Sequence, residues 1–267
     1  MIDSVTDAVG IPMLVAINLP IGMVFFYKRS KNVSLWCFAV GAICFVLFAT
    51  VLESLLHSVM IAGTTEISKK ILASPALYTL YGALAAGIFE ETGRLFGFKV
   101  LLRNHNERTC PVAYGMGHAG IEIILTLGVT YVMLAAVQVG TVIGTESNTA
   151  QLLATANSLT LTDGAFAIFE RISAVMLHIG LSMVMFVACR CKGMLRLWPA
   201  AIALHALADV PAALYQTQVI RSLYVVEAPI FLLGAACLVF GKRLMDKYIG
   251  SEPAEPAGEA LPEPPAE

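Results

Sequence analysis

Residues 82–102, GALAAGIFEETGRLFGFKVLL, decide the fold and raise the question of function. The stretch is long and apolar enough to cross a bilayer, yet it contains Glu90, Glu91 and Arg94. A charged side chain at membrane depth costs a few kcal/mol or more, so charges in such a segment have partners or a function. The stretch therefore predicts a membrane helix that contributes to a buried polar site.

The composition extends this conclusion to the whole chain. The protein has 267 residues, of which 58% are hydrophobic and 13% charged, and its mean hydropathy is +0.77. A soluble domain has about half apolar and about a quarter charged residues. We therefore expect an all-α, polytopic protein of the cell membrane, in a bacterium the plasma membrane, in contact with the lipid bilayer and with no nucleic acid.

Seven spans are predicted from the apolar segments, since about twenty such residues cross a hydrocarbon core. The third span is expected to begin irregularly, because EISKKILASPALYTLYG (66–82) has room for an interfacial turn. Small residues in GMGHAG (115–120) are expected to let the fourth helix approach its neighbours closely. The predicted helices are 8–27, 34–56, 73–101, 112–137, 165–188, 197–215 and 222–241.

Basic residues predict the orientation, because Lys and Arg concentrate in cytoplasmic connections. The N-terminus is expected outside and the C-terminus in the cytoplasm, with the long connection 140–165 outside. The opposite set of connections carries only Lys69, Lys70 and Arg221. The set assigned to the cytoplasm carries Lys28, Arg29, Lys31, Arg103, Arg108, Arg190, Lys192, Arg196, Lys242, Arg243 and Lys247.

Two parts follow from this pattern. Residues 1–248 form the predicted transmembrane domain with an intramembrane active site, and residues 249–267 form a predicted disordered, Pro/Glu-rich cytoplasmic tail. The six cysteines are scattered and are expected to be apolar side chains or reduced thiols. His105, in a polar inner connection, is expected to be solvated.

Ionisable residues on four spans share a predicted depth. At 1.5 Å per residue, Glu90, His118, His178 and His205 lie about 16, 9, 15 and 12 Å below the inner face. The cheapest arrangement points these groups toward one another. Spacing by four or seven residues adds partners on the same helix faces: Glu90 with Arg94, His118 with Glu122, His205 with Asp209, and His178 with Arg171.

Two chemistries are compatible with this set. Three histidines can bind Zn²⁺ and leave a position for water, which a neighbouring carboxylate deprotonates. Without metal, Glu90 or Glu91 and His118 would activate water while His205 and Asp209 stabilise the oxyanion. In both cases the predicted reaction is hydrolysis of a peptide bond within the membrane.

Three motifs carry a resemblance to known families. EETGR (90–94), YGMGH (114–118) and HALAD (205–209) resemble the E-E-x-x-x-R, F-x-x-x-H and H-x-x-x-N/D motifs of the type II CAAX-protease and bacteriocin-processing superfamily. Arg94 stands one residue closer to the glutamates than that pattern requires. This spacing leaves open which glutamate corresponds to the catalytic one.

A closer resemblance is to the YhfC-like membrane peptidases. It rests on GRLF (93–96), GMGHAGIE (115–122) and ERISAVMLHIGLS (170–182), and it covers most of residues 80–215. The resemblance implies an intramembrane metallopeptidase that opens toward the cytoplasm and cleaves a membrane-embedded or lipid-linked peptide. The expected catalytic residues are Glu90, Glu91, Arg94 and Asp209, and the expected zinc ligands are His118, Glu122, His178 and His205.

Two rival functions use the same residues. A proton- or metal-coupled transporter also needs intramembrane histidines and carboxylates, and in a scaffold subunit they would only brace the bundle. Other polar residues are expected to be structural. We expect Glu53 and His57 to be interfacial, Glu227 to pack, and Glu170 and Arg171 to brace helices.

Overall fold

The computed structural model describes residues 4–250 and contains only helices and their connections there. Residues 251–267 of the predicted tail lie outside the described part. Six helices are long and apolar enough to cross a membrane, and a bent pair of helices makes up to seven. The expectation of an all-α membrane bundle is therefore confirmed.

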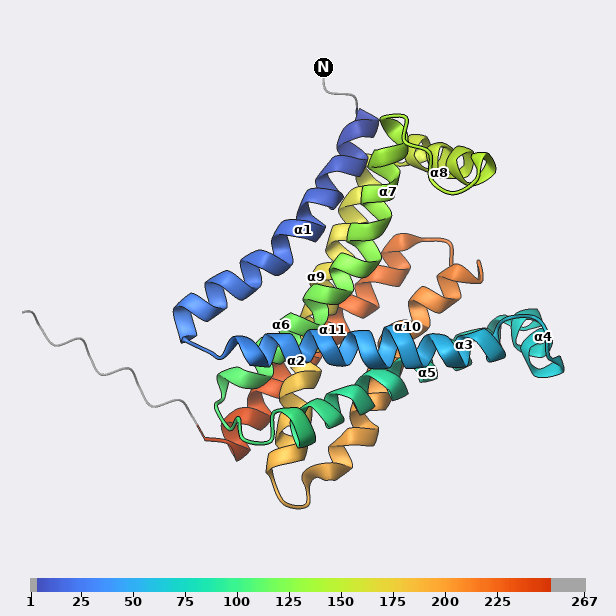
Figure 1. Ribbon diagram of the computed structural model, residues 1–267. Coiled ribbons are helices and arrows are strands. Elements are labelled where there is room, and N and C mark those ends of the chain that lie inside the picture. Colours follow the sequence, from blue (N-terminus) through green and yellow to red (C-terminus); the bar gives the residue numbers. More distant parts are fainter. Residues whose placement is uncertain (1–3, 251–267) are drawn as a thin grey trace, which may run out of the picture.

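The spans correspond closely to the predicted helices (Figure 1). Three of them contain π-helical turns that continue the same helix without a break. The spans and their parts are α1 (Ser4–Lys31); α2, η1 and α3 (Leu35–Phe45, Val46–Glu53, Ser54–Met60); α5 and η2 (Pro75–Phe96, Gly97–Leu101); α6, η3 and α7 (Thr109–Ile123, Ile124–Gly128, Val129–Gln138); α9 (Leu161–Arg190); α10 (Leu197–Gln216), preceded by the 3₁₀ turn η4 (Met194–Arg196); and α11 (Leu223–Tyr248).

The expected irregularity before the third span is a sharp bend. Helix α4 (Glu66–Ala73) meets α5 at 108°. Ser74 separates the helices, and its side chain accepts a hydrogen bond from Leu77 N. Pro75 then occupies the first turn of α5, where its missing N–H is tolerated. This sequence of cap and proline starts the new helix at the bend.

The long connection 140–165 contains a helix that the sequence analysis did not predict. Helix α8 (Glu146–Ser158) begins at Thr145, whose side chain accepts a hydrogen bond from Asn148 N. Its composition is too polar for a span, so the pattern of apolar segments does not predict it. In Figure 1, α8 lies beside the end of α7.

Helix α9 is the most enclosed span. It packs against α6 and α11, while α5 packs against α10 and α2 packs against α6 (Figure 1). In its most apolar window 72% of residues are buried, against 39% or fewer in the other five single spans. Helix α9 therefore lies among α5, α6 and α10, the other three helices that carry the predicted polar layer.

Glycines bring α6 into backbone contact with its neighbours. A Cβ on Gly117 would lie 2.0 Å from the carbonyl oxygen of Phe38 in α2. A Cβ on Gly115 would lie 2.7 Å from Ile179 Cα in α9. The expectation that GMGHAG serves close helix packing is confirmed.

Hydrogen bonds gather several helix ends and connections at one end of the bundle. Tyr27 Oη donates to Thr109 O at 3.5 Å, which joins the end of α1 to the start of α6. Arg190 Nη2 donates to Leu102 O at 2.6 Å and to His105 O at 2.9 Å. Arg108 Nη1 donates to Met245 O at 3.0 Å. The connections rich in Lys and Arg thus lie together, and we name this the basic end.

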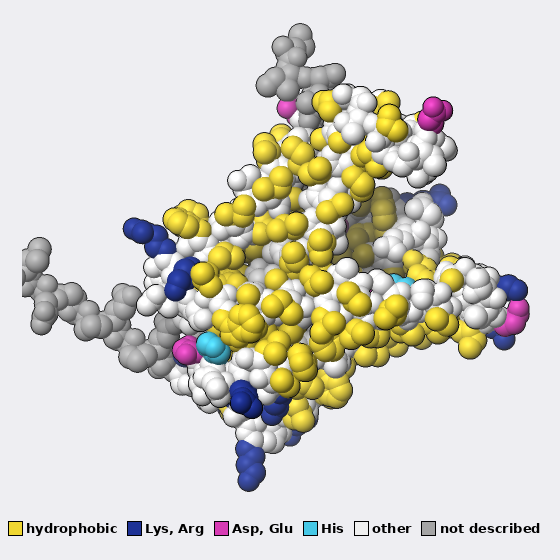
Figure 2. All heavy atoms as spheres, in the orientation of Figure 1, with side chains coloured by type: hydrophobic (Ala, Val, Ile, Leu, Met, Phe, Trp, Pro, Cys, Tyr) yellow, Lys and Arg dark blue, Asp and Glu magenta, His cyan; other side chains and the backbone are white. Residues whose placement is uncertain are grey.

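The surface is that of a protein in lipid. Figure 2 shows hydrophobic side chains over most of the visible face, with Lys and Arg concentrated at its edges. The surface has a hollow between the helices α7 and α8 on one side and the helices α3 and α4 on the other (Figures 1 and 2). Large apolar side chains such as Leu14, Phe26 and Leu232 are well exposed.

Candidate functional site

Four buried ionisable side chains from four helices converge on one point. Glu90 in α5 places its Oε2 atom 2.8 Å from His118 Nε2 in α6. The same oxygen lies 3.9 Å from His178 Nδ1 in α9 and 3.6 Å from His205 Nε2 in α10. These four residues form what we call the intramembrane site. Their predicted convergence is confirmed, while their roles remain predictions.

Arg94 joins this site through Glu91 and not through Glu90. Its Nη1 donates to Glu91 Oε1 at 2.8 Å, and both side chains are fully buried. Its Nη2 lies 3.3 Å from His118 Nε2 and 3.1 Å from His178 Nδ1. The predicted pairing of Glu90 with Arg94 is therefore wrong. Because Glu91 is three residues from Arg94, it takes the arginine and leaves Glu90 facing the histidines.

His178 has a partner on each of its nitrogens. Its Nε2 lies 2.7 Å from Glu122 Oε2, and Arg171 Nη1 donates to Glu122 Oε1 at 2.8 Å. Glu170 also binds the Arg171 guanidinium. Glu122 was expected to partner His118, but it contacts His178 instead. A carboxylate at Nε2, the nitrogen that points away from Glu90, fixes the orientation and the tautomer of the His178 ring, so that Nδ1 faces the intramembrane site.

His205 is oriented in a similar way. Its Nδ1 lies 2.7 Å from Glu91 Oε1, so this carboxylate oxygen contacts both Arg94 and His205. The opposite nitrogen, Nε2, faces Glu90 and lies 3.7 Å from Asp209 Oδ2. The predicted pairing of His205 with Asp209 is confirmed. The Asp209 side chain is 37% exposed, in contrast to the buried histidine beside it.

Aromatic side chains enclose the site toward the basic end. The Phe45 ring meets His118 edge-on at 5.0 Å between centroids. Tyr114 lies one turn before His118 and packs against Phe98 at 4.6 Å, and Phe186 packs against Phe98 at 5.5 Å. These buried rings form an apolar layer between the intramembrane site and the basic end.

A cavity lies beside Asp209, on the side of the site opposite the basic end. It has a volume of about 220 Å³ and lies between α3, α5 and α10. Asp209 lines it, together with Tyr78 and Gln216 in the terminal turns of α5 and α10. An opening at the basic end was expected, but this cavity lies at the other end of the bundle, and which end faces the cytoplasm stays a prediction.

Two residues that were expected at the membrane interface belong to this region. Glu53 is only 8% exposed, and it interacts electrostatically with Glu90, His205 and Asp209. His57 Nε2 lies 3.3 Å from Glu53 Oε1, and His57 lines the cavity. Its Nδ1 lies 2.6 Å from Tyr81 Oη. A count of residues along one helix placed Glu53 far from the site, because it could not include the crossing of α2–α3 over α5.

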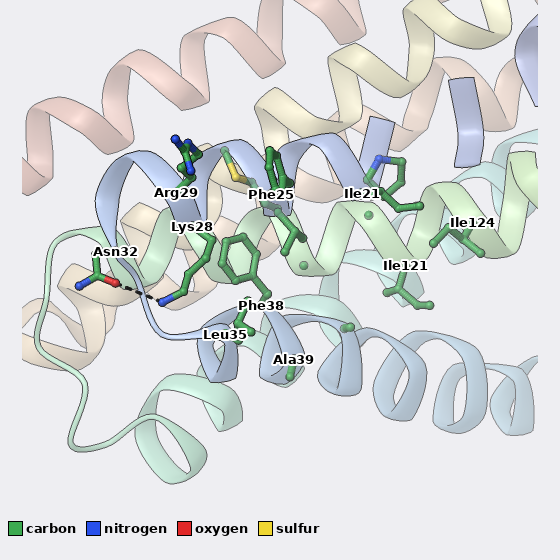
Figure 3. Close-up of a pocket in the computed structure, with 16 residues that line it drawn as sticks. Ile21, Phe25, Lys28, Arg29, Asn32, Leu35, Phe38, Ala39, Ile121 and Ile124 are labelled. Atoms are coloured by element: carbon green, nitrogen blue, oxygen red, sulfur yellow. Dashed lines mark hydrogen bonds between the residues drawn. The ribbon is translucent and has the colours of Figure 1, made fainter. Parts of the chain in front are cut away.

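Other predicted features lie away from the site. Glu227 is buried in α11, as its expected packing role requires. A larger groove of about 860 Å³ lies between α1, α2 and α6. Figure 3 shows apolar side chains such as Ile21 and Phe38 lining it, with Lys28 and Arg29 toward one end. No residue of the intramembrane site lines this groove.

The donor atoms of the site fit a divalent metal ion. Glu90, His118 and His178 each offer one ligand atom, and these atoms lie within 4.8 Å of one another. One carboxylate oxygen and two imidazole nitrogens form a set that catalytic zinc uses. All three residues are buried, so each would lose its hydration without a partner. The Nη2 of Arg94 lies beside the same nitrogens and would have to move aside for an ion.

Comparisons with known proteins agree with this chemistry. A model of the YhfC intramembrane metalloprotease family matches residues 15–230. The chain is 35% identical over 235 residues to the uncharacterized membrane protein YhfC of Bacillus subtilis (strain 168), covering 83% of this chain and 89% of that protein. No solved structure gave a significant match.

Proposed function

The chain belongs to the YhfC intramembrane metalloprotease family, and we propose that it hydrolyses peptide bonds within the membrane with a bound zinc ion. The convergence of Glu90, His118 and His178 from three helices carries this proposal. Scattered bracing residues would not place three ligand atoms within reach of one ion.

Glu90 Oε2, His118 Nε2 and His178 Nδ1 would hold the metal. A bound divalent ion makes water more acidic and polarises a carbonyl group, which is the chemistry that peptide hydrolysis requires. Glu122 has a positioning role, because it contacts the outer nitrogen of His178. This assignment differs from the sequence-based one, in which His118, Glu122, His178 and His205 were the ligands and Glu90 was catalytic.

His205 would accept the proton of the attacking water. Glu91 contacts its Nδ1 at 2.7 Å, which favours a proton on Nδ1 and a free lone pair on Nε2. The water oxygen adds to the scissile carbonyl carbon and its proton passes to Nε2. The C–N bond then breaks, and the leaving amine takes this proton from the imidazolium.

Arg94 and Asp209 would support this step from two sides. Arg94 neutralises Glu91 and thereby holds the carboxylate that orients His205. Asp209 lies between His205 and the cavity, so it is placed to guide water toward Nε2. The apolar layer of Phe98, Tyr114 and Phe186 would keep water from the basic end out of the site.

The expected substrate is a membrane-embedded or lipid-linked peptide. The site is buried among membrane spans, and the cavity at Asp209 is small and half-enclosed by helices. A folded soluble protein could not reach Glu90 by this route. A segment that unwinds near the cavity mouth could present one peptide bond to it.

Two variants separate the proposed roles. The purified protein, His118→Ala and His205→Gln would be compared for zinc content by elemental analysis and for cleavage of a peptide in lipid vesicles. We expect His118→Ala to lose cleavage together with the zinc of the intramembrane site. We expect His205→Gln to retain zinc and lose cleavage, because it removes the proton acceptor and not a ligand.

A matched control is Glu146→Gln, which changes an exposed carboxylate in α8. It should leave both readouts unchanged. Cleavage retained by folded His118→Ala and His205→Gln would refute the proposal. Loss of zinc from His205→Gln would instead make His205 a ligand.

A further inference from the structure

A second group of metal-ligating side chains lies at the basic end, apart from the intramembrane site. Cys37 and Cys110 are buried, and their Sγ atoms are 2.7 Å apart. His105 Nδ1 lies 3.9 Å from Cys37 Sγ. The three ligand atoms all lie within 4.8 Å of one another. We name these residues the cysteine–histidine cluster.

The cluster joins three separate segments of the chain. Cys37 lies in the first turn of α2, and Cys110 lies in the first turn of α6. His105 belongs to the connection between η2 and α6. The N-terminal turn of a helix favours a thiolate, because its free N–H groups and its dipole stabilise negative charge. Both cysteines therefore lie in the first turn of a helix, one in α2 and one in α6.

The connection that carries His105 is held in place independently of the cluster. Arg190 donates hydrogen bonds to the carbonyl oxygens of Phe98, Leu102 and His105. The Arg190 guanidinium also lies over the Phe186 ring at 4.8 Å. The backbone at His105 is thus fixed, and the imidazole is presented to the two thiols without a loop having to fold around an ion.

We propose that Cys37, His105 and Cys110 bind a second zinc ion. Two thiolates and one imidazole are a common set of zinc ligands, and the fourth position is open to Glu107 or water. Glu107 Oε2 lies 3.5 Å from His105 Nδ1, so its carboxylate is within reach. Binding releases the two thiol protons to solvent, and no electron is transferred.

The geometry needs little adjustment for this ion. Zn–S bonds of 2.3 Å in a tetrahedron require the two sulfurs to separate by about 1 Å more than they do here. His105 is the most accessible member, with 27% of its side chain exposed, so an ion can enter from its side. The bound ion would join the starts of α2 and α6 to the connection after η2.

A disulfide between Cys37 and Cys110 is the competing outcome. The positive-inside pattern predicts that the basic end faces the cytoplasm, where thiols stay reduced. The imidazole beside the thiols also has no role in a disulfide but supplies the third ligand to a metal. These two observations favour the ion. The ion would also give a function to two cysteines expected to be apolar side chains or reduced thiols and to a histidine expected to be solvated.

Cobalt substitution provides the sharpest test, because Co²⁺ bound by thiolate has a charge-transfer band that oxygen and nitrogen ligands do not produce. The full-length protein, purified anaerobically, would be titrated with Co²⁺ and then with Zn²⁺. We expect the thiolate band to appear and to be displaced by zinc. The band should persist in His118→Ala, which changes only the intramembrane site, so failure of the proposed function would not affect this result.

The His105→Ala variant tests the cluster without altering a buried thiol. Loss of an outer partner of a metal ligand costs about 10–100-fold in affinity, and loss of a ligand should cost at least as much. Cys189→Ser, at the same end of the bundle, is the matched control and should bind Co²⁺ unchanged. Any of three results would overturn the proposal. These are the absence of a thiolate band, an unchanged Co²⁺ affinity in His105→Ala, and a Cys37–Cys110 disulfide in the anaerobic protein.

Discussion

Glu90 and Glu91 are neighbours in the chain but face different partners. Successive residues on a helix point about 100° apart, so the two carboxylates cannot serve the same groups. Arg94 binds Glu91, and Glu90 therefore remains the carboxylate that faces His118. The three-residue spacing of Glu91 and Arg94 in EETGR thus has a structural meaning: it determines which glutamate the arginine neutralises.

A double-mutant cycle tests the buried ion pair between Glu91 and Arg94. Breaking such a pair leaves an uncompensated buried charge and costs about 3–5 kcal/mol. We expect Glu91→Gln and Arg94→Gln each to lower the free energy of unfolding by about this amount. The double variant should be less destabilised than the sum of the two, as measured by denaturant unfolding in detergent. Simple additivity would show that the two side chains do not interact.

Glu122 offers a prediction about metal affinity. Replacing it with Gln removes the charge at the outer nitrogen of His178 while keeping the shape of the side chain. Zinc affinity should fall about 10–100-fold, as it does when such outer partners are lost. Isothermal titration would measure the change, with Glu146→Gln as the exposed control. An unchanged affinity would mean that His178 does not depend on Glu122.

At the scale of helices, the apolar segments and their lengths could be predicted from the sequence, because lipid demands them. The π-helical turns η1, η2 and η3 could not. Each inserts extra residues into a turn and rotates the following face, and no residue pattern signals this shift. The pairing of Glu122 with His178, across two helices, was missed because spacing along α6 alone suggested His118.

Close packing of α6 on α2 gives a prediction at this scale. Gly117→Ala would place a Cβ 2.0 Å from the carbonyl oxygen of Phe38, so the helices would have to separate. We expect a loss of stability of about 1–3 kcal/mol and weaker zinc binding, because the next residue is His118. Thermal unfolding and zinc titration would measure both effects.

The control for this variant is Gly22→Ala in α1, where a Cβ meets no atom within 4 Å. Alanine favours a helix over glycine by about 1 kcal/mol, so this change should be neutral or slightly stabilising. A Gly117→Ala protein as stable as wild type would argue against the tight contact between α6 and α2.

At the scale of the whole molecule, the cavity at Asp209 and the burial of Glu53 depend on how helices cross. The sequence contains every one of the residues involved, but their proximity arises from how α3, α5 and α10 come together around one cavity. Depth along separate helices could predict that four polar groups lie at a common level. It could not predict from which end of the bundle that level is reached.

Filling the cavity tests whether it supplies the site. Gly82 lines it, and a Cβ there meets no atom within 4 Å, so the side chain of Gly82→Leu has room to start and would reduce the free space of the cavity. We expect slower cleavage with unchanged zinc content. Gly22→Leu, which adds the same side chain to an open position on α1, should leave cleavage unaffected. Equal rates in both variants would mean that water and substrate enter elsewhere.

The hydrogen bonds that Tyr27, Arg108 and Arg190 make at the basic end have a mechanical consequence. When helices are held together at one end, the displacement of a residue increases with its distance from that end. Thermal motion of the helices would then be smallest near these residues and larger around Tyr78 and Gln216, where a single exposed hydrogen bond of 3.3 Å joins α5 to α10. The mouth of the cavity could then widen for a large substrate while the residues of the intramembrane site keep their spacing.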